Sequence, residues 1–177
     1  MKTLALLVTI GALVSGCSAM SQPTPGNNNA TAELKNATGQ PVGTARLSQL
    51  SSGVRVVLEM RGMPPGAHGV HIHEVGKCDP PAFTTAGGHF NPGAKKHGAL
   101  NPAGPHAGDL PNVTIGPDGT GRLESMAELV SLGAGGTSIF DADGSALVVH
   151  AGLDDFQTDP AGNSGARIAC GVIVKAR

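Results

Sequence analysis

Short segments of alternating apolar and polar residues, each ended by glycine or proline, restrict this chain to β structure. Residues 53–60, GVRVVLEM, place valine, leucine and methionine on one side and charged residues mainly on the other, as in a strand with one buried face. VTIGPDGTGRLES predicts two strands around a Pro-Asp-Gly turn, and DADGSALVVH and ARIACGVIVKA predict two more. Residues 125–136 allow at most a short helical turn. We therefore predict one all-β domain.

Composition limits both the core and the partners. The chain has 177 residues, 2% aromatic and without Trp or Tyr, so the core must consist of Val, Ile, Leu and Ala. A hydrophobic content of 40% and a formal charge of -1 are typical of a globular domain without the positive charge that nucleic acid requires.

The N-terminus has the features of an export signal. Lys2 precedes the apolar run TLALLVTIGALV, and small residues come just before Cys17. The run is too short for a membrane span, so we predict a bacterial lipoprotein signal (1–16), a flexible tether from acylated Cys17 (17–29) and a folded domain (30–177). A plain secretory signal with an incidental cysteine is the alternative. Either signal predicts export, and the first predicts a lipid anchor on the periplasmic or outer face of a membrane.

Export changes the meaning of the two remaining cysteines. In an oxidising compartment an even pair such as Cys78 and Cys170 favours a disulfide. Closing so long a loop would add about 4 to 5 kcal/mol on the chain-entropy model. Thiolate ligation of a metal is the alternative, although neither cysteine has the close CxxC partner usual in zinc sites.

The histidines indicate metal binding. In GAHGVHIHEV, His71 and His73 alternate along a predicted strand and therefore share a face, although an isolated HxH is more often an ordinary hydrogen-bonded pair. The stretch 76–111 has little periodicity, and a loop of that length is usually functional or disordered. It contains three imidazoles and a carboxylate, a combination that suits tetrahedral zinc: His89, His97, His106 and Asp109. With His150 at a strand end, every histidine except His68 has a candidate ligand role.

Six motifs in family order make the chain resemble the copper/zinc superoxide dismutases of the bacterial periplasmic type. They are HGVHIHEVGKC, AGGHFNP, KKHG, HAGDLPNV, LVVHAGLDD and GNSGARIACGVI. The resemblance implies a Greek-key β-sandwich that closes toward a flattened barrel of about eight strands, with the metals outside it under two long loops. Bacterial members differ in their dimer interface, so a monomer and a homodimer both stay open.

The resemblance also implies a site for one copper and one zinc per chain. The implied copper ligands are His71, His73, His89 and His150. The implied zinc ligands are His89, His97, His106 and Asp109, with His89 bridging the metals. Asp154 would hydrogen-bond one ligand of each metal, and His68 would support the copper site without binding metal. Cys78 and Cys170 match the family's disulfide, and Arg167 matches its active-site arginine.

The implied activity is the dismutation of superoxide to dioxygen and hydrogen peroxide. It needs a metal that cycles by one electron, which copper does and zinc does not. A bridging imidazolate at His89 can take up and deliver a proton, and Arg167 can attract and orient a small anion. One alternative is a non-catalytic copper/zinc-binding or copper-storage lipoprotein, which a lost copper ligand or a missing arginine would favour. The other is a zinc hydrolase, which four protein ligands on zinc would prevent.

Overall fold

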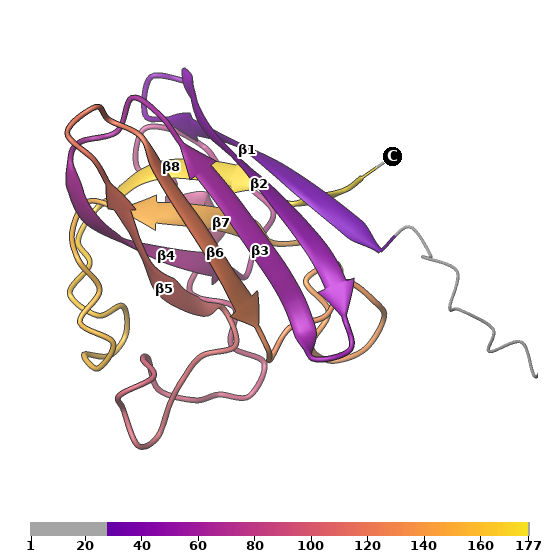
Figure 1. Cartoon of the computed structure of the whole chain (residues 1–177). Helices are drawn as coiled ribbons and strands as arrows, with labels where there is room; N and C mark the ends of the chain where they lie inside the picture. The colour runs from indigo at the N-terminus through magenta and orange to yellow at the C-terminus, as the bar shows by residue number, and fades with distance from the viewer. Residues whose placement is uncertain (1–27, 177) are drawn as a thin grey trace, which may run out of the picture.

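The structure, a computed structural model, describes residues 28–176, and its regular secondary structure consists almost entirely of β-strands (Figure 1). The strands are β1 (Asn29–Asn36), β2 (Pro41–Leu50), β3 (Gly53–Met60), β4 (Gly66–His73), β5 (Asp109–Ile115), β6 (Gly121–Ala127), β7 (Ala146–His150), β8 (Arg167–Val172) and β9 (Val174–Lys175). The predicted signal, and Cys17 with its acylation, lie outside the described residues. The first strand begins one residue before the predicted domain start.

The strands form a closed antiparallel barrel in the order β1-β2-β3-β6-β5-β4-β7-β8, and β1 pairs with both β2 and β8. The short β9 pairs with the other end of β1. Strands that are not consecutive in the chain lie side by side at β3–β6 and β4–β7, which gives the Greek-key connections. The predicted fold is confirmed.

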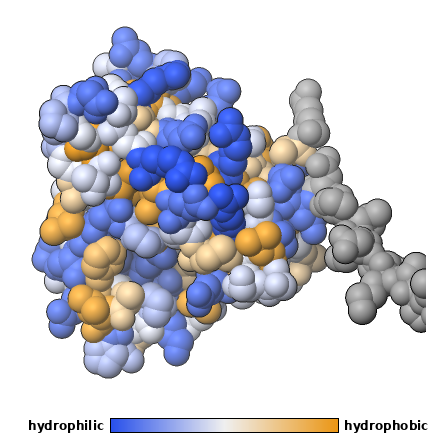
Figure 2. All heavy atoms as spheres, viewed as in Figure 1, coloured by the Kyte–Doolittle hydropathy of each residue, from blue (hydrophilic) through white to orange (hydrophobic). Residues whose placement is uncertain are grey.

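Alternation along β3 explains why this segment forms part of the wall. Its apolar residues Val54, Val56, Leu58 and Met60 are buried. Arg55 and Glu59 face outward and pair with Glu124 of β6 and Arg46 of β2, respectively. Figure 2 shows hydrophilic side chains gathered over the middle of the face that β2, β3 and β6 form. The barrel therefore separates an aliphatic interior from a charged wall.

Helical structure is scarce in residues 28–176. The one element of this kind there is a single 3-10 turn, Thr84–Ala86. The short helical turn allowed for 125–136 does not form, because Ser125–Ala127 continue β6 and pair with β3. Within the same described range, no helix has the length and hydropathy needed to cross a membrane.

Two long connections cover one side of the barrel. Residues 74–108 join β4 to β5, and residues 151–166 join β7 to β8. A disulfide between Cys78 and Cys170, with Cα atoms 5.6 Å apart, ties the first connection to β8. Phe83 packs beside this bridge in a small buried cluster. The predicted disulfide is confirmed, and thiolate ligation of a metal by these cysteines is therefore wrong.

Candidate metal centre

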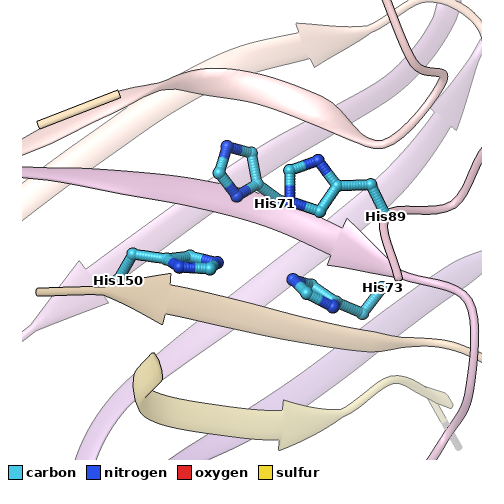
Figure 3. A group of neighbouring side chains, drawn as sticks. All are labelled: His71, His73, His89 and His150. Atoms are coloured by element: carbon cyan, nitrogen blue, oxygen red, sulfur yellow. The ribbon is translucent and has the colours of Figure 1, made fainter. Parts of the chain in front are cut away.

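Four buried histidines meet where β4 and β7 lie side by side, and we call them the first set: His71, His73, His89 and His150. His71 and His73 lie on β4, which pairs with β7 up to the residue before His150. His89 enters from the 74–108 connection through a bridge to His73. One ligand atom from each residue lies within 4.8 Å of the others. Figure 3 shows the rings of His73 and His150 pointing toward one another, with His71 and His89 beside them.

Hydrogen bonds at the outer edge fix the tautomers of three of these rings. His71 Nε2–H donates to Asp154 at 2.6 Å. His73 and His150 donate from Nδ1–H to the carbonyl oxygens of Gly87 and Gly165, at 3.0 and 3.1 Å. The opposite nitrogens of the three rings, His71 Nδ1, His73 Nε2 and His150 Nε2, are buried and have no hydrogen-bond partner within residues 28–176.

These nitrogens are the strongest indication of a bound metal. Buried polar atoms are nearly always paired, and here three unprotonated nitrogens converge with none. Burial lowers the pKa of His71 to about 3, of His73 to about 2 and of His150 to about 4. The rings are therefore neutral at pH 7, and a neutral imidazole is the form that binds a metal.

A second set surrounds Asp109, the first residue of β5: His89, His97, His106 and Asp109. Asp109 Oδ1 lies 2.9 Å from His89 Nδ1 and 3.0 Å from His97 Nδ1. It also lies 3.4 Å from His106 Nδ1. Three imidazole nitrogens thus surround one carboxylate oxygen, and three imidazoles with a carboxylate are a donor set that suits zinc. His89 belongs to both sets.

Distance alone leaves the fourth member of the second set ambiguous. Ligand atoms of His71, His89, His97 and Asp109 also lie within 4.8 Å of one another. The hydrogen bonds of His71 make it a member of the first set. Nε2 of His71 is bonded to Asp154 and its Nδ1 is one of the unpaired atoms of the first set. Nδ1 of His106, in contrast, lies 3.3 Å from His89 Nδ1.

Asp154 connects the two sets. Its Oδ2 accepts from His71 and its Oδ1 from His97 Nε2, at 2.6 and 3.0 Å. Burial acts to raise the pKa of Asp154, but these imidazoles outweigh it and hold the pKa well below its usual range. Burial acts to lower the pKa of His97, but hydrogen bonds to Asp109 and Asp154 raise it to about 9. Burial also acts to raise the pKa of Asp109, but hydrogen bonds from the three imidazoles of the second set hold that pKa well below its usual range, so both carboxylates are negatively charged at pH 7.

The position of Asp154 beside His97 depends on two neighbouring residues that were not among the predicted site residues. Asn112 of β5 clamps the Asp154 backbone through reciprocal hydrogen bonds of 2.9 Å. Gly162 has φ +61°, and an added Cβ there would lie 2.8 Å from His97 Nε2. Both residues lie within or beside the quoted motifs, but nothing in their residue types indicates these contacts.

Arg167 begins β8 beside the first set. Its guanidinium donates to the carbonyl oxygens of Phe83 and Gly87, at 2.7 and 2.6 Å. Gly87 O therefore accepts from both Arg167 and His73. A hollow of about 470 Å³, lined partly by Thr84 and Gly165, opens the half-buried guanidinium to solvent. The structure thus holds a cation at fixed position near the first set.

His68 takes no part in either set. Its Nδ1 lies 2.8 Å from the carbonyl oxygen of His150, and its Nε2 lies 2.9 Å from that of Pro64. Both nitrogens therefore face backbone oxygens, and the ring supports the end of β7.

The chain forms a closed antiparallel barrel with two adjoining sets of candidate metal ligands on one side. This combination is typical of a β-barrel protein with a two-metal, histidine-rich centre. Residues 41–173 match the family model of copper/zinc superoxide dismutase (SODC). The chain belongs to this copper/zinc superoxide dismutase family.

Relatives and solved structures agree with this assignment. The chain is 51% identical to superoxide dismutase [Cu-Zn] 1 of Aquifex aeolicus, with 80% of this chain and 85% of the relative covered. It is 46% identical to superoxide dismutase [Cu-Zn] of Caulobacter vibrioides, with 82% and 85% covered. A SOD-like protein from Bacillus subtilis superposes with a TM-score of 0.79 at 41% identity, over 81% of this chain and 97% of that one.

Proposed function

We propose that this chain dismutates superoxide, with copper held by the first set and zinc by the second. The overall reaction converts two superoxide anions and two protons into dioxygen and hydrogen peroxide. Three observations support the assignment: the four-histidine set, the three imidazoles around Asp109 and the fixed arginine. The convergence of three buried, unpaired imidazole nitrogens carries it.

The donor atoms fit the two metals. Copper in the first set would supply one-electron redox chemistry, while redox-inert zinc in the second set would supply fixed positive charge beside His89. The chain's own contribution is rigidity. The carbonyls of Gly87 and Gly165 and the carboxylate of Asp154 hold three rings in the required tautomers.

His89 and Arg167 have the roles closest to the reaction. His89 Nδ1 faces Asp109 in the second set, which leaves its Nε2 as the atom that can hold and release a proton on the side of the first set. Arg167 places a positive charge at the solvent-exposed hollow, where a small anion can be attracted and oriented.

The structure makes His150 a cleaner test of copper binding than His71. His71 is joined through Asp154 to the zinc-set residue His97, so its removal disturbs both sets. His150 bonds only to Gly165 at its outer nitrogen. We expect His150→Ala to lose copper and superoxide-consuming activity while keeping zinc, and Asp109→Ala to lose zinc first.

Metal content and the rate of superoxide decay, measured for both purified variants, test whether each variant loses the expected metal. Full turnover by His150→Ala would contradict the copper assignment. Unchanged zinc binding by Asp109→Ala would contradict the zinc assignment.

We also propose that the enzyme is exported and held by a lipid on Cys17 at the periplasmic or outer face of a membrane. The proposal is supported by the apolar run and small residues before this cysteine. Mass spectrometry of the N-terminal peptide from cells should show a diacylglyceryl-modified Cys17. An unmodified cysteine would contradict the anchor.

A further inference from the structure

Asp159 lies in the 151–166 connection and faces zinc-set residues from the other connection. Its Oδ1 accepts a hydrogen bond from the backbone N–H of His97 at 2.9 Å and lies 3.9 Å from His106 Nε2. Its Oδ2 accepts from Lys96 Nζ at 2.9 Å. One carboxylate therefore contacts the backbone of one zinc-set histidine and approaches the ring of another.

The orientation of the His106 ring determines which of its nitrogens faces Asp159. Its Nδ1 is turned inward, 3.4 Å from Asp109 Oδ1. If Nδ1 gives its lone pair to a metal, Nε2 carries the ring proton on the side of Asp159. A carboxylate that accepts the ring N–H of a metal-binding imidazole fixes its tautomer. At 3.9 Å the contact is too long for a direct hydrogen bond, so it acts through charge.

We propose that Asp159 is a positioning residue of the zinc site. Its hydrogen bond holds the backbone at His97, and its negative charge faces the proton that Nε2 of His106 would carry when Nδ1 binds zinc. The inference rests on the zinc assignment made above. Asp154 touches a residue of each set, whereas the only ligand-set residues that Asp159 approaches belong to the second set. Its removal should therefore weaken zinc binding and leave copper binding unchanged.

A surface ion pair with Lys96 is the competing explanation. The side chains of Lys96 and Asp159 are 60% and 35% exposed, and exposed pairs contribute little to stability. The two explanations differ in what Lys96→Met does. If only the ion pair mattered, this variant would loosen zinc as much as Asp159→Ala. If the carboxylate acts on the zinc ligands, removing the lysine leaves its charge uncompensated and zinc binds at least as tightly.

Asp155 offers a matched control in the same connection. Its carboxylate accepts hydrogen bonds from Gln157, Thr158 and Asn163, and these bonds order the loop. Within residues 28–176, its side chain forms no hydrogen bond with a member of the second set. Asp155→Asn therefore tests whether general loosening of the loop is enough to weaken zinc binding.

Zinc affinity of the purified full chain, measured by competition with a chromophoric chelator, tests the proposal. We expect Asp159→Ala to bind zinc roughly tenfold more weakly. Asp159→Asn keeps an oxygen acceptor for His97 N–H but loses the charge. Its zinc affinity should therefore lie between that of Asp159→Ala and that of the unmodified chain. Asp155→Asn and Lys96→Met should bind zinc no more weakly than the unmodified chain. Copper affinity should not change in any of the four variants.

A second readout separates positioning from folding. Visible absorption of Co²⁺ bound in the zinc site should change in Asp159→Ala and stay unchanged in Asp155→Asn. Unaltered zinc affinity in Asp159→Ala, or an equal loss in Asp155→Asn or Lys96→Met, would overturn the proposal.

Asp109→Ala serves as the reference for the zinc assignment. If it binds zinc like the unmodified chain, the zinc assignment fails, and this inference with it. If it loses zinc while Asp159→Ala does not, only this inference fails.

Discussion

Replacing Arg167 with isoleucine removes a cation that the structure fixes beside the first set. The guanidinium is held by the carbonyl oxygens of Phe83 and Gly87, at 2.7 and 2.6 Å. These contacts do not involve the unpaired imidazole nitrogens, so both sets of ligands remain intact in the variant. We therefore expect Arg167→Ile to bind both metals and to consume superoxide more slowly.

The size of the effect follows from the position of the charge. A monoanion about 4 Å from a cation gains about 1 kcal/mol in water and about 4 kcal/mol at the effective dielectric of a protein surface. Arg167 is half-buried and faces an open hollow, so the lower part of that range applies. A gain of about 1.4 kcal/mol corresponds to a factor of ten. We expect a rate loss of roughly tenfold at low ionic strength.

The assay is superoxide decay against ionic strength, at equal copper and zinc content. The loss should shrink as salt rises, because the Debye length falls to about 10 Å at 0.1 M. Arg167→Lys should restore only part of the rate, since an ammonium lacks the planar fork that meets both carbonyls. Arg46→Ile removes the same charge from the outer face of β2 and controls for net charge. Equal rates for Arg167→Ile and Arg46→Ile at low ionic strength would refute the reasoning.

Three further predictions follow from the same contacts. Asp154→Ala should weaken both copper and zinc by about 10- to 100-fold in chelator competition, and loss of only one metal would contradict its bridging role. Replacing both Cys78 and Cys170 with serine removes a disulfide between residues 92 positions apart. The free energy of unfolding should fall by about 4 to 5 kcal/mol on the chain-entropy model. An unchanged denaturant midpoint would argue against this. In the metal-free protein, burial holds the pKa of three first-set imidazoles at about 2 to 4, below the unfolded value of about 6.5. The three lowered pKa values outweigh the raised pKa of His97, about 9, so the unfolded chain binds more protons below about pH 6.5. The free energy of unfolding should therefore fall as pH falls from about 6.5 toward 4, and an equal or higher value at pH 5 than at pH 7 would contradict this.

Local pattern was enough to predict many of the strands and the shared face of two site histidines. Alternation along β3 depends only on neighbouring residues, and the Pro-Asp-Gly turn between β5 and β6 is a local signal. The spacing of His71 and His73 likewise predicted that they share a face of β4. The convergence of the loop histidines with those of β4 and β7 needed the resemblance, because no spacing rule connects His89 with His150, 61 positions further along the chain.

The remaining features depend on contacts that leave no mark on residue type. Arg167 is held by backbone carbonyls of Phe83 and Gly87, and every residue has a carbonyl. Asn112 and Asp159 are ordinary polar residues until the fold brings them to Asp154 and His97. Closure of the barrel between β1 and β8 also joins opposite ends of the chain, so its register cannot be read from either segment alone.

The number of superoxide anions consumed per copper tests the central claim most directly. Purified full chain, loaded with one zinc and increasing copper, should consume superoxide over many turnovers, with a rate that rises linearly to one copper per chain and then levels off. A copper-storage protein would consume no more superoxide than its copper can reduce or oxidise once. Consumption that stops at this stoichiometric limit would contradict the proposed function.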